Sequence, residues 1–320
     1  MNQQQKMEAF RPAIVSLNPC IDTCVYLPSP LCPGRTHRAE RTVQHIGGKG
    51  LNQAIVFRNL GVAADYYSFG SQNDKDAVDE EITSQRVCYH KIPAACGIRE
   101  NLKIIDADGV GTEINQRGGP ITPEEMAQME RALASSTATL LSVCGSIPVG
   151  VRGDVYRQII SDAKQKGMVT VLDAAGEALA LGMEACPDLI KPNRHELAGL
   201  CGVDSAELID EKDVIRRCCA IYEKYGTTVL HTMDEQGSLY VGKEGIYRAG
   251  IAKYPMRGFS GAGDTYLAAF LYATFDQKMQ VSAALAFAAR AAAAKIALDG
   301  TQLPTREQID AVGEVEVREI

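Results

Sequence analysis

Short apolar runs alternate with segments of helical periodicity from about residue 138 onward. Three of the runs have the length and composition of buried strands: 139–144, 169–173 and 228–232. Two longer segments between them repeat apolar residues as amphipathic helices do: 153–166 and 205–225. Strands and helices that alternate in this way form βαβ units, which place helices on both faces of a parallel sheet. The pattern therefore predicts a doubly wound α/β fold.

Two polar stretches with strand alternation interrupt this rhythm in the first 120 residues, at 20–46 and 88–116. Within the second stretch, the polar positions share one face of a predicted strand: Arg99, Asn101 and Lys103. The apolar positions share the other face: Ile98, Leu102 and Ile104. Asp108-Gly109 favours a hairpin turn, after which 110–115 returns. We expect either a lid whose cationic face lines a cleft or an edge hairpin whose polar face is solvated.

The composition is that of a globular protein, with 320 residues of which 46% are hydrophobic and 23% are charged. This length suits one main domain over residues 1–320, into which the two polar stretches are inserted. The net charge of -7 and the pI of about 5.4 favour neither a nucleic acid nor an anionic membrane as partner. A small anionic substrate is still compatible with this net charge, because a local cationic pocket can lie on an acidic protein.

The sequence carries no pattern for export or for a metal cluster. No run approaches the ~18 apolar residues that span a bilayer, and the N-terminal segment lacks the apolar core of a signal peptide. We therefore expect a cytoplasmic protein. The ten cysteines are scattered and form no Cys-x-x-Cys pair, which favours buried free thiols over disulfides or zinc ligands.

A glycine cluster, Gly47-Gly48-Lys49-Gly50, precedes a predicted helix over 51–60. Glycines let the backbone approach a ligand closely, and the free amides at the start of a helix favour an anion. The segment is not a Walker loop, because its spacing differs and Leu51 stands where Ser or Thr would bind magnesium. On its own the cluster fits an anion site or a tight turn equally well.

A second cluster, 258–263, has three glycines in six residues and opens the longest apolar helix, with Asp264 in the first turn. A phosphate cradle beside a carboxylate is what phosphoryl transfer requires. The alternative is that Asp264 only complements the helix dipole. A hydrolase nucleophile at Ser260 is excluded, because the second glycine of that motif is missing and no histidine follows His231.

Between the clusters, Lys191-Pro192-Asn193 follows a predicted strand over 188–191 and opens a helix that contains Glu196. A strand-to-helix switch at the carboxyl end of a parallel sheet is where ligands bind in α/β folds. A simple helix cap is the alternative, because Asn193 and Glu196 also have the spacing of a capping box.

Taken together, these residues resemble the ribokinase-like carbohydrate kinases, in the branch of 1-phosphofructokinases and tagatose-6-phosphate kinases. The resemblance extends from about residue 13 to 312. It rests on an ordered series of motifs: Leu17-Asn18-Pro19, Ile21-Asp22, Gly47-Gly48-Lys49-Gly50 with Asn52, Arg99-x-Asn101, Thr112-Glu113-Ile114-Asn115, Gly145-Ser146-x-Pro148, Lys191-Pro192-Asn193 with Glu196, and Gly261-Ala262-Gly263-Asp264.

The resemblance implies a ribokinase-like α/β sandwich with a small β-sheet lid made from 20–46 and 88–116, through which homodimers often form. Sugar hydroxyls would be held by Asp22, Gly47, Gly48, Lys49 and Asn52. The phosphate already on the sugar would be met by Arg99, Asn101 and Lys103. The nucleotide would lie against Lys191, Asn193, Thr232, Gly237, Gly261 and Gly263. Hydrated Mg²⁺ would be positioned by Asn193 and Glu196.

The chemistry implied by the resemblance is phosphoryl transfer from ATP to a sugar phosphate. Amides of Gly261, Ala262 and Gly263 would stabilise the transferred group, and Asp264 would be the catalytic base. Fructose 1-phosphate is the expected substrate, with tagatose 6-phosphate and fructose 6-phosphate as alternatives. An alternative of another class is a catalytically weak sugar-phosphate binding protein, which the intact 261–264 segment disfavours.

Two segments depart from the usual pattern of the family. Where relatives have Ser-Leu-Gly-x-x-Gly beside the nucleotide, this chain has Thr-Met-Asp-Glu-Gln-Gly at 232–237. Asp234 and Glu235 would repel a polyphosphate unless they point outward. Phe259-Ser260 replaces the usual Thr-Val before the second glycine cluster. These departures affect the expected nucleotide affinity more than the expected chemistry.

Overall fold

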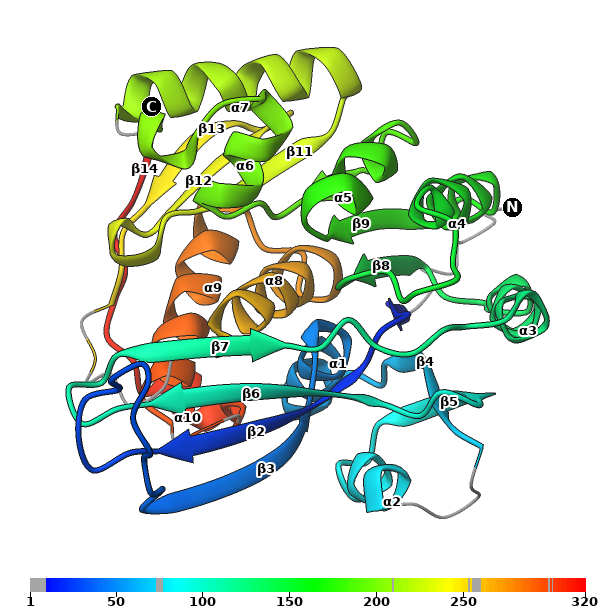
Figure 1. Ribbon diagram of the computed structural model, residues 1–320. Coiled ribbons are helices and arrows are strands. Elements are labelled where there is room, and N and C mark those ends of the chain that lie inside the picture. The colour runs from blue at the N-terminus through cyan, green and yellow to red at the C-terminus, as the bar shows by residue number, and fades with distance from the viewer. Residues whose placement is uncertain are drawn as a thin grey trace.

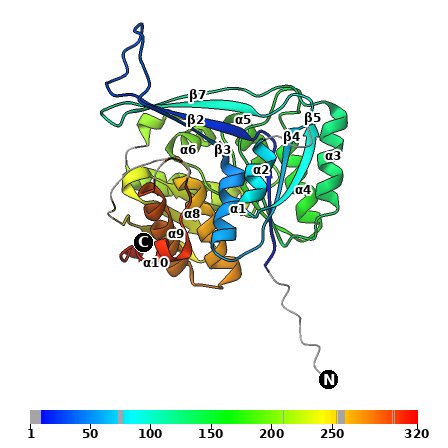
Figure 2. The same ribbon diagram turned by 90° about the horizontal axis from the view of Figure 1, so that it is seen from below.

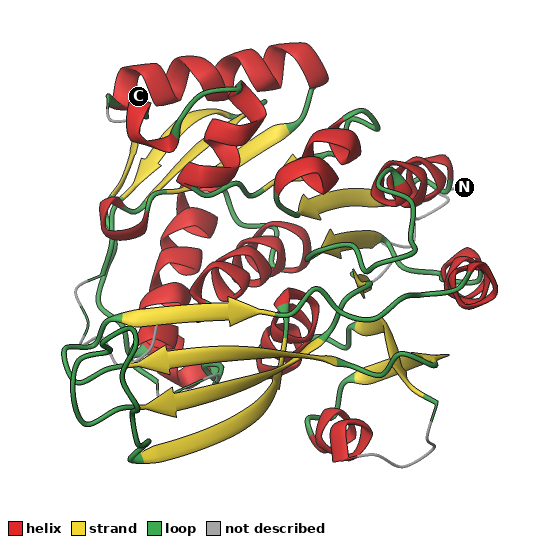
Figure 3. Ribbon diagram, in the orientation of Figure 1, coloured by secondary structure: helices red, strands yellow, loops and turns green. Residues whose placement is uncertain are grey.

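The computed structural model describes residues 10–72, 77–208, 210–252, 254, 260–298, 300 and 302–320. The N-terminal residues 1–9 lie outside this part, as do Gly258 and Phe259 of the second glycine cluster. Helices cover both faces of a large sheet, and a smaller separate sheet lies beside it (Figures 1 and 3). The predicted α/β fold with a small β-sheet lid is confirmed.

The large sheet has ten strands in the described residues, in the order β14-β13-β12-β11-β10-β9-β8-β1-β4-β5. In chain order they are β1 (Pro12–Ser16), β4 (Asp65–Ser71), β5 (Cys88–Ala94), β8 (Leu140–Cys144), β9 (Val169–Asp173), β10 (Leu189–Ile190), β11 (Thr228–Thr232), β12 (Ser238–Gly242), β13 (Gly245–Ala249) and β14 (Val317–Glu319). The strands from β11 to β5 run parallel, and β12, β13 and β14 are antiparallel. Because β1 pairs with both β4 and β8, the strand order reverses there, and ligands bind at such a switch point.

Alternate residues of the central strands enter two separate cores. On β9, Val171 belongs to one core and Leu172 to the other. The first core is covered by α1 (Lys49–Asn59), α2 (Ala77–Ser84), α8 (Ala262–Leu271), α9 (Val281–Ile296) and α10 (Arg306–Asp310). The second is covered by α3 (Pro123–Ala134), α4 (Val155–Gln165), α5 (Gly176–Met183), α6 (Arg194–Cys201) and α7 (Glu211–Tyr225). Figure 2 shows α8, α9 and α10 on one side of the molecule and α3 and α4 on the other.

The smaller sheet is the lid, and in Figure 2 it lies along the upper edge of the molecule. It contains β2 (Cys20–Tyr26), β3 (Arg41–Gly47), β6 (Arg99–Ile105) and β7 (Gly111–Asn115), in the order β3-β2-β6-β7. The predicted lid range 88–116 was too long at its start. Residues 88–94 form β5 and pair with β4 in the large sheet, so the second lid segment begins at Arg99.

The predicted helix over 205–225 was wrong in its first part. A 3₁₀ turn spans Ser205–Glu207, and α7 begins at Glu211. The side chain of Asp210 accepts a hydrogen bond from the amide of Lys212 and caps the helix. Apolar periodicity continues across such a cap, so it could not reveal the break.

All ten cysteines are free thiols. Only four of them are buried, Cys20, Cys24, Cys144 and Cys218, so the expectation of buried thiols holds for fewer than half. Within the described residues, no helix has the length and apolar character needed to cross a membrane.

Candidate active site

Asp264 lies where the starts of α8 and α1 meet. The helix α8 begins at Ala262, after Gly261 with a φ of 85°, which is a conformation that favours glycine. Asp264 is 8% exposed, and its Oδ2 accepts a hydrogen bond of 2.7 Å from Asn52 Nδ2 on α1. The two glycine clusters, more than 200 residues apart in the sequence, therefore form one site.

A second carboxylate, which the sequence analysis did not single out, lies beside the first. Asp173 is the last residue of β9 and is 1% exposed. Its Oδ1 is 2.7 Å from Lys49 Nζ and 3.4 Å from Lys191 Nζ. Asp173 therefore links a lysine expected on the sugar side to one expected on the nucleotide side. Its position at the carboxyl end of a buried parallel strand is the signal that could have found it.

The two carboxylates have pKa values shifted in opposite directions. For Asp173, burial favours the neutral acid, but Lys191 and Lys49 outweigh burial and hold the pKa below its usual value. For Asp264, burial and then the charge of Asp173 raise the pKa. Lys49 and the hydrogen bond from Asn52 oppose this shift without cancelling it. A carboxylate with a raised pKa is a stronger base once ionised, which suits proton acceptance near neutral pH.

The polar face of the lid is buried against the glycine cradle. Lys103 Nζ is 2.8 Å from Asp22 Oδ2 and 2.5 Å from Ser260 Oγ, just before α8. Asn101 Nδ2 donates a hydrogen bond of 3.1 Å to Asp22 Oδ1 on the neighbouring strand. Asn101 and Lys103 are each 7% exposed, so the alternative of a solvated edge hairpin is wrong.

Arg99 presents a positive charge at the same face. Its guanidinium donates hydrogen bonds to the carbonyls of Asn18 and Gln116 and to Asn101 Oδ1. Within the described ranges, Arg99 forms no ion pair with a carboxylate. A guanidinium held by neutral carbonyls keeps its full charge for an anionic ligand.

The glycines before α1 are explained by close backbone approach. A Cβ on Gly47 would lie 2.3 Å from Asp22 Oδ2, and Gly48 has a φ of 103°. On the opposite side of the site, a Cβ on Gly263 would lie 3.4 Å from Lys191 Nζ. A side chain at Gly47 would displace the Asp22 carboxylate, and one at Gly48 would require a strained backbone, whereas Gly263 only packs closely against Lys191.

A further residue missed in the sequence is Lys295, near the end of α9. It is fully buried, and its Nζ donates a hydrogen bond of 2.9 Å to the carbonyl of Gly300. Its Cε lies 3.5 Å from where a Cβ on Gly261 would be. Lys295 therefore packs directly beneath the start of α8, but a lysine in an alanine-rich helix gave no sign of this.

Asn193 and Glu196 form the capping box that the sequence analysis left as an alternative. Asn193 Oδ1 accepts from the amide of Glu196, and Glu196 Oε2 accepts from the amide of Asn193, both at 2.9 Å. Glu196 Oε1 stays outside the box, 3.6 Å from Lys49 Nζ.

The donor set near this helix start fits Mg²⁺ held through water. The described residues contain no group of three or more His, Cys, Asp or Glu that could hold a metal ion directly. They do supply Glu196 Oε1, and Asp173 Oδ2 is buried without a hydrogen-bond partner in the described part of the chain. Mg²⁺ prefers oxygen ligands and usually keeps several of its waters.

The predicted nucleotide loop lies beside Asn193. The amide of Thr232 donates to the carbonyl of Pro192 at 3.1 Å. Gly237 has a φ of 88°, and a Cβ there would lie 2.3 Å from the carbonyl oxygen of Ala249, so neighbouring backbone accounts for this glycine. Asp234 and Glu235 form part of an exposed 3₁₀ turn over Asp234–Gln236.

Comparisons with known proteins show which proteins the chain resembles. The family described as pfkB family carbohydrate kinase matches residues 15–308. The chain is 28% identical over 268 residues to the 1-phosphofructokinase of Escherichia coli, covering 82% of this chain and 83% of that protein. It is 30% identical over 268 residues to the 1-phosphofructokinase of Haemophilus influenzae, covering 80% of this chain and 84% of that protein.

The fold also has a close match among solved structures. Escherichia coli phosphofructokinase-2, in a crystal structure with substrates and products, gives a TM-score of 0.86 at 24% identity, covering 94% of this chain and 98% of that one. The family match spans both glycine clusters, the lid and Asp264. The chain therefore belongs to the pfkB family of carbohydrate kinases and is a phosphotransferase that acts on a sugar hydroxyl.

Proposed function

We propose that the protein is a 1-phosphofructokinase, which transfers the γ-phosphoryl group of ATP to fructose 1-phosphate and forms fructose 1,6-bisphosphate. The observation that carries the proposal is the lid face that contacts the segment before α8 through Lys103 and Ser260, where Arg99 has no carboxylate partner in the described residues. A kinase of neutral sugars has no use for such a charge. The two 1-phosphofructokinases reported above support the same substrate.

The sugar lies between the lid and the start of α1. Asp22 and Asn52 bind its hydroxyls, Gly47 leaves room for the Asp22 carboxylate, and Gly48 supplies the positive φ with which the backbone enters α1. Arg99, Asn101 and Lys103 bind the phosphate that the sugar already carries. Lys103 is already bonded to Asp22 and Ser260, so an incoming phosphate competes with these partners. Lys49 contacts Asp173 and Glu196, so we assign it to the junction between sugar and nucleotide.

The transfer step follows from the position of Asp264. The sugar hydroxyl loses its proton to Asp264, its oxygen bonds to the γ-phosphorus, and the bond from that phosphorus to the bridging oxygen of ADP breaks. The amides of Gly261, Ala262 and Gly263, at the start of α8, stabilise the negative charge on the transferred group. The raised pKa of Asp264 favours its role as base over that of a helix cap. The raised pKa also argues against the alternative that the protein only binds sugar phosphates and does not catalyse transfer.

The nucleotide lies across Lys191, Asn193, Thr232 and Gly237, with Asp234 and Glu235 directed to solvent. Asn193 and Glu196 would hold Mg²⁺ through water. When bound, Mg²⁺ neutralises charge on the β- and γ-phosphates.

Replacing Arg99 with alanine is expected to raise the KM for fructose 1-phosphate about tenfold or more. A charge-assisted hydrogen bond contributes ~1.5 to 3 kcal/mol, and ~1.4 kcal/mol corresponds to a factor of ten. Steady-state kinetics with a coupled assay for ADP measures the change. The matched control is Arg41→Ala, because Arg41 also lies in the lid but stacks over Tyr26. An unchanged KM in Arg99→Ala would place the phosphate elsewhere.

The lid is expected to form a homodimer interface through its outer face. Leu102 and Ile104 are only half-buried, and Ile114 is 57% exposed, so three apolar side chains share an uncovered face of β6 and β7. A second copy is the simplest cover, since twofold dimers are the commonest oligomers. Sedimentation at micromolar concentration should give a dimer, and Ile114→Lys should shift it to monomer. A wild-type monomer at that concentration would contradict the proposal.

We place the enzyme in the cytoplasm. Ten free thiols, of which Cys88 is exposed, support a reducing compartment, because exposed thiols in oxidising compartments tend to form disulfides.

A further inference from the structure

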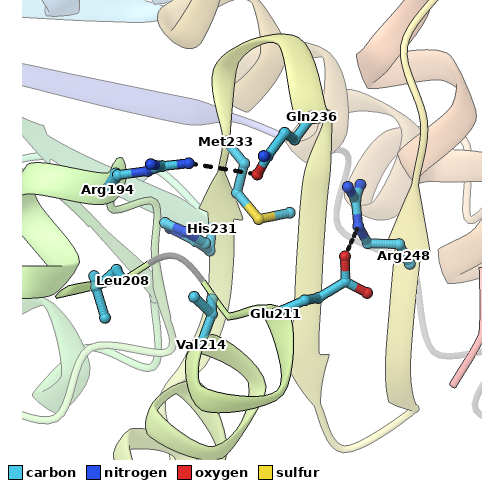
Figure 4. A pocket seen from close by; sticks show the side chains of 8 residues that line it. All are labelled: Arg194, Leu208, Glu211, Val214, His231, Met233, Gln236 and Arg248. Atoms are coloured by element: carbon cyan, nitrogen blue, oxygen red, sulfur yellow. Dashed lines mark hydrogen bonds and ion pairs between the residues drawn. The ribbon is translucent and has the colours of Figure 1, made fainter. Parts of the chain in front are cut away.

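A cavity of about 330 Å³ is lined by the side chains that Figure 4 labels, and it lies on the opposite side of the large sheet from α8 and α9. It opens between α6, α7 and the end of β11. Its apolar floor is made by Leu208, Val214 and Met233, which belong to the core under α3 to α7. Asp264 packs on the other face, in a helix of the first core. The cavity is therefore separate from the phosphoryl-transfer site.

Two guanidinium groups flank the floor of this cavity. Arg248 is held by Glu211, at 3.2 Å, and by the carbonyl of Ala249. Arg194 contacts the neutral side chain of Gln236, at 3.4 Å. Within the described residues, the lining thus holds two positive charges and one negative charge. A net positive cavity on a chain with a net charge of -7 indicates an anionic ligand.

The histidine in the wall adds no charge at neutral pH. His231 Nδ1 lies 3.0 Å from the carbonyl oxygen of Pro192, so Nδ1 carries the proton and donates it. Burial lowers the pKa of His231 to about 4, and the ring is neutral. Among the described lining residues, the polar groups are therefore the two guanidinium groups, Glu211, Gln236 and the neutral ring of His231.

We propose that this cavity binds a small organic phosphate, with the dianion between Arg194 and Arg248 and its carbon part on Leu208, Val214 and Met233. The volume is at the lower end of the ~300 to 1,000 Å³ range of small-molecule sites, which suits a phosphate monoester. A guanidinium binds phosphate with paired hydrogen bonds, and one dianion matches two of them. Nothing in the proposed kinase reaction uses this site.

Occupancy of the cavity weakens nucleotide binding. Three pocket residues are direct sequence neighbours of residues assigned to the nucleotide: Arg194 beside Asn193, Met233 beside Thr232, and Gln236 beside Gly237. A bound dianion cancels the positive charge of Arg194 next to the polyphosphate, so ATP and ADP bind less tightly. By reciprocity, nucleotide weakens binding of the phosphate monoester by the same factor. This coupling rests on the proposed nucleotide site, whereas the anion site does not.

Isothermal titration calorimetry with phenyl phosphate tests the anion site without requiring turnover. Arg194→Gln should weaken binding about tenfold or more, because Arg194 is half-buried and its side chain makes no hydrogen bond to the backbone of the described residues that its loss would break. Arg99→Gln should leave binding at the cavity intact, and Arg152→Gln, which removes a guanidinium that is 84% exposed, is the control for net charge. Loss of binding in Arg99→Gln but not in Arg194→Gln would locate phenyl phosphate in the sugar site and overturn the proposal. Absence of any binding would overturn it too.

Titration of ADP with Mg²⁺, in the absence and presence of saturating phenyl phosphate, tests the coupling. The dissociation constant for ADP should rise several-fold with phenyl phosphate in wild type and should not change in Arg194→Gln. An unchanged constant in wild type would overturn the coupling. If ADP fails to bind under any condition, the proposed kinase function fails, while the phenyl phosphate titration still decides the anion site.

Discussion

Asp264→Asn is expected to lower kcat by about 10²- to 10⁴-fold while binding of fructose 1-phosphate barely changes. The amide keeps the shape of the side chain but cannot accept the hydroxyl proton, and loss of a general base has an effect of about this size. Single-turnover kinetics and calorimetry with the sugar phosphate separate the rate from the affinity. The acid limb of the wild-type kcat/KM profile should lie above the usual aspartate pKa, because the pKa of Asp264 is raised.

The same substitution is expected to raise the melting temperature at neutral pH. The folded pKa of Asp264 lies above its unfolded value, so Asp264 begins to destabilise the folded state as the pH rises above its unfolded pKa, and the cost is complete above the folded pKa. As the pH falls through the folded pKa, wild-type Asp264 takes up its proton and the advantage of the variant shrinks, until it disappears below the unfolded pKa. Differential scanning calorimetry between about pH 4 and 8 measures this difference.

The helix-dipole alternative predicts the opposite result. If Asp264 only capped α8, the variant would lose ~0.3 to 1 kcal/mol of stability and keep its turnover. Asp213→Asn is a matched control, because Asp213 lies in the first turn of α7 and its pKa is lowered by Arg217 and Arg216. The control should lose stability modestly at unchanged kcat. A destabilised Asp264→Asn with near-normal kcat would show that Asp264 is a cap.

Asp173→Asn is expected to reduce the free energy of unfolding by roughly 3 to 5 kcal/mol, because removing one member of a buried ion pair leaves its partners uncompensated. Lys191 is 5% exposed and would lose its carboxylate partner in the described residues. Thermal unfolding compared with wild type measures the loss. Asp154→Asn is the control, because its partners Arg152 and Arg157 are well exposed and such surface pairs contribute little to stability.

Loss of Asp173 should also move the pH dependence of catalysis. Its charge is the second cause, after burial, of the raised pKa of Asp264. Without that charge the pKa of Asp264 falls, so the acid limb of the kcat/KM profile should shift to lower pH. If Asp173→Asn is as stable as wild type and its kcat/KM profile keeps the same acid limb, then Asp173 neither stabilises the fold nor raises the pKa of Asp264.

Local patterns predicted the elements that carry the chemistry. Glycine spacing located the starts of α1 and α8, because close backbone approach and positive φ demand glycine at Gly47, Gly48 and Gly261. Strand alternation placed Asn101 and Lys103 on one face. The resemblance supplied the pairing of these segments, which alternation and spacing alone could not give.

Long-range contacts explain what the sequence did not show. Asp173 ends an ordinary apolar strand, and only the fold reveals that Lys49 and Lys191 meet there. The cavity between Arg194 and Arg248 depends on α6 and β13, which are distant in the chain. The break before α7 depends on a cap at Asp210, which apolar periodicity does not register.

The central claim, that this kinase acts on a phosphorylated ketohexose, is tested most directly by one coupled assay of ADP release. The purified protein is given Mg²⁺-ATP and, separately, fructose 1-phosphate, fructose 6-phosphate, tagatose 6-phosphate, fructose and ribose. Our account predicts the highest kcat/KM with fructose 1-phosphate and no turnover of the two free sugars. Turnover of fructose or ribose without turnover of any sugar phosphate would contradict it.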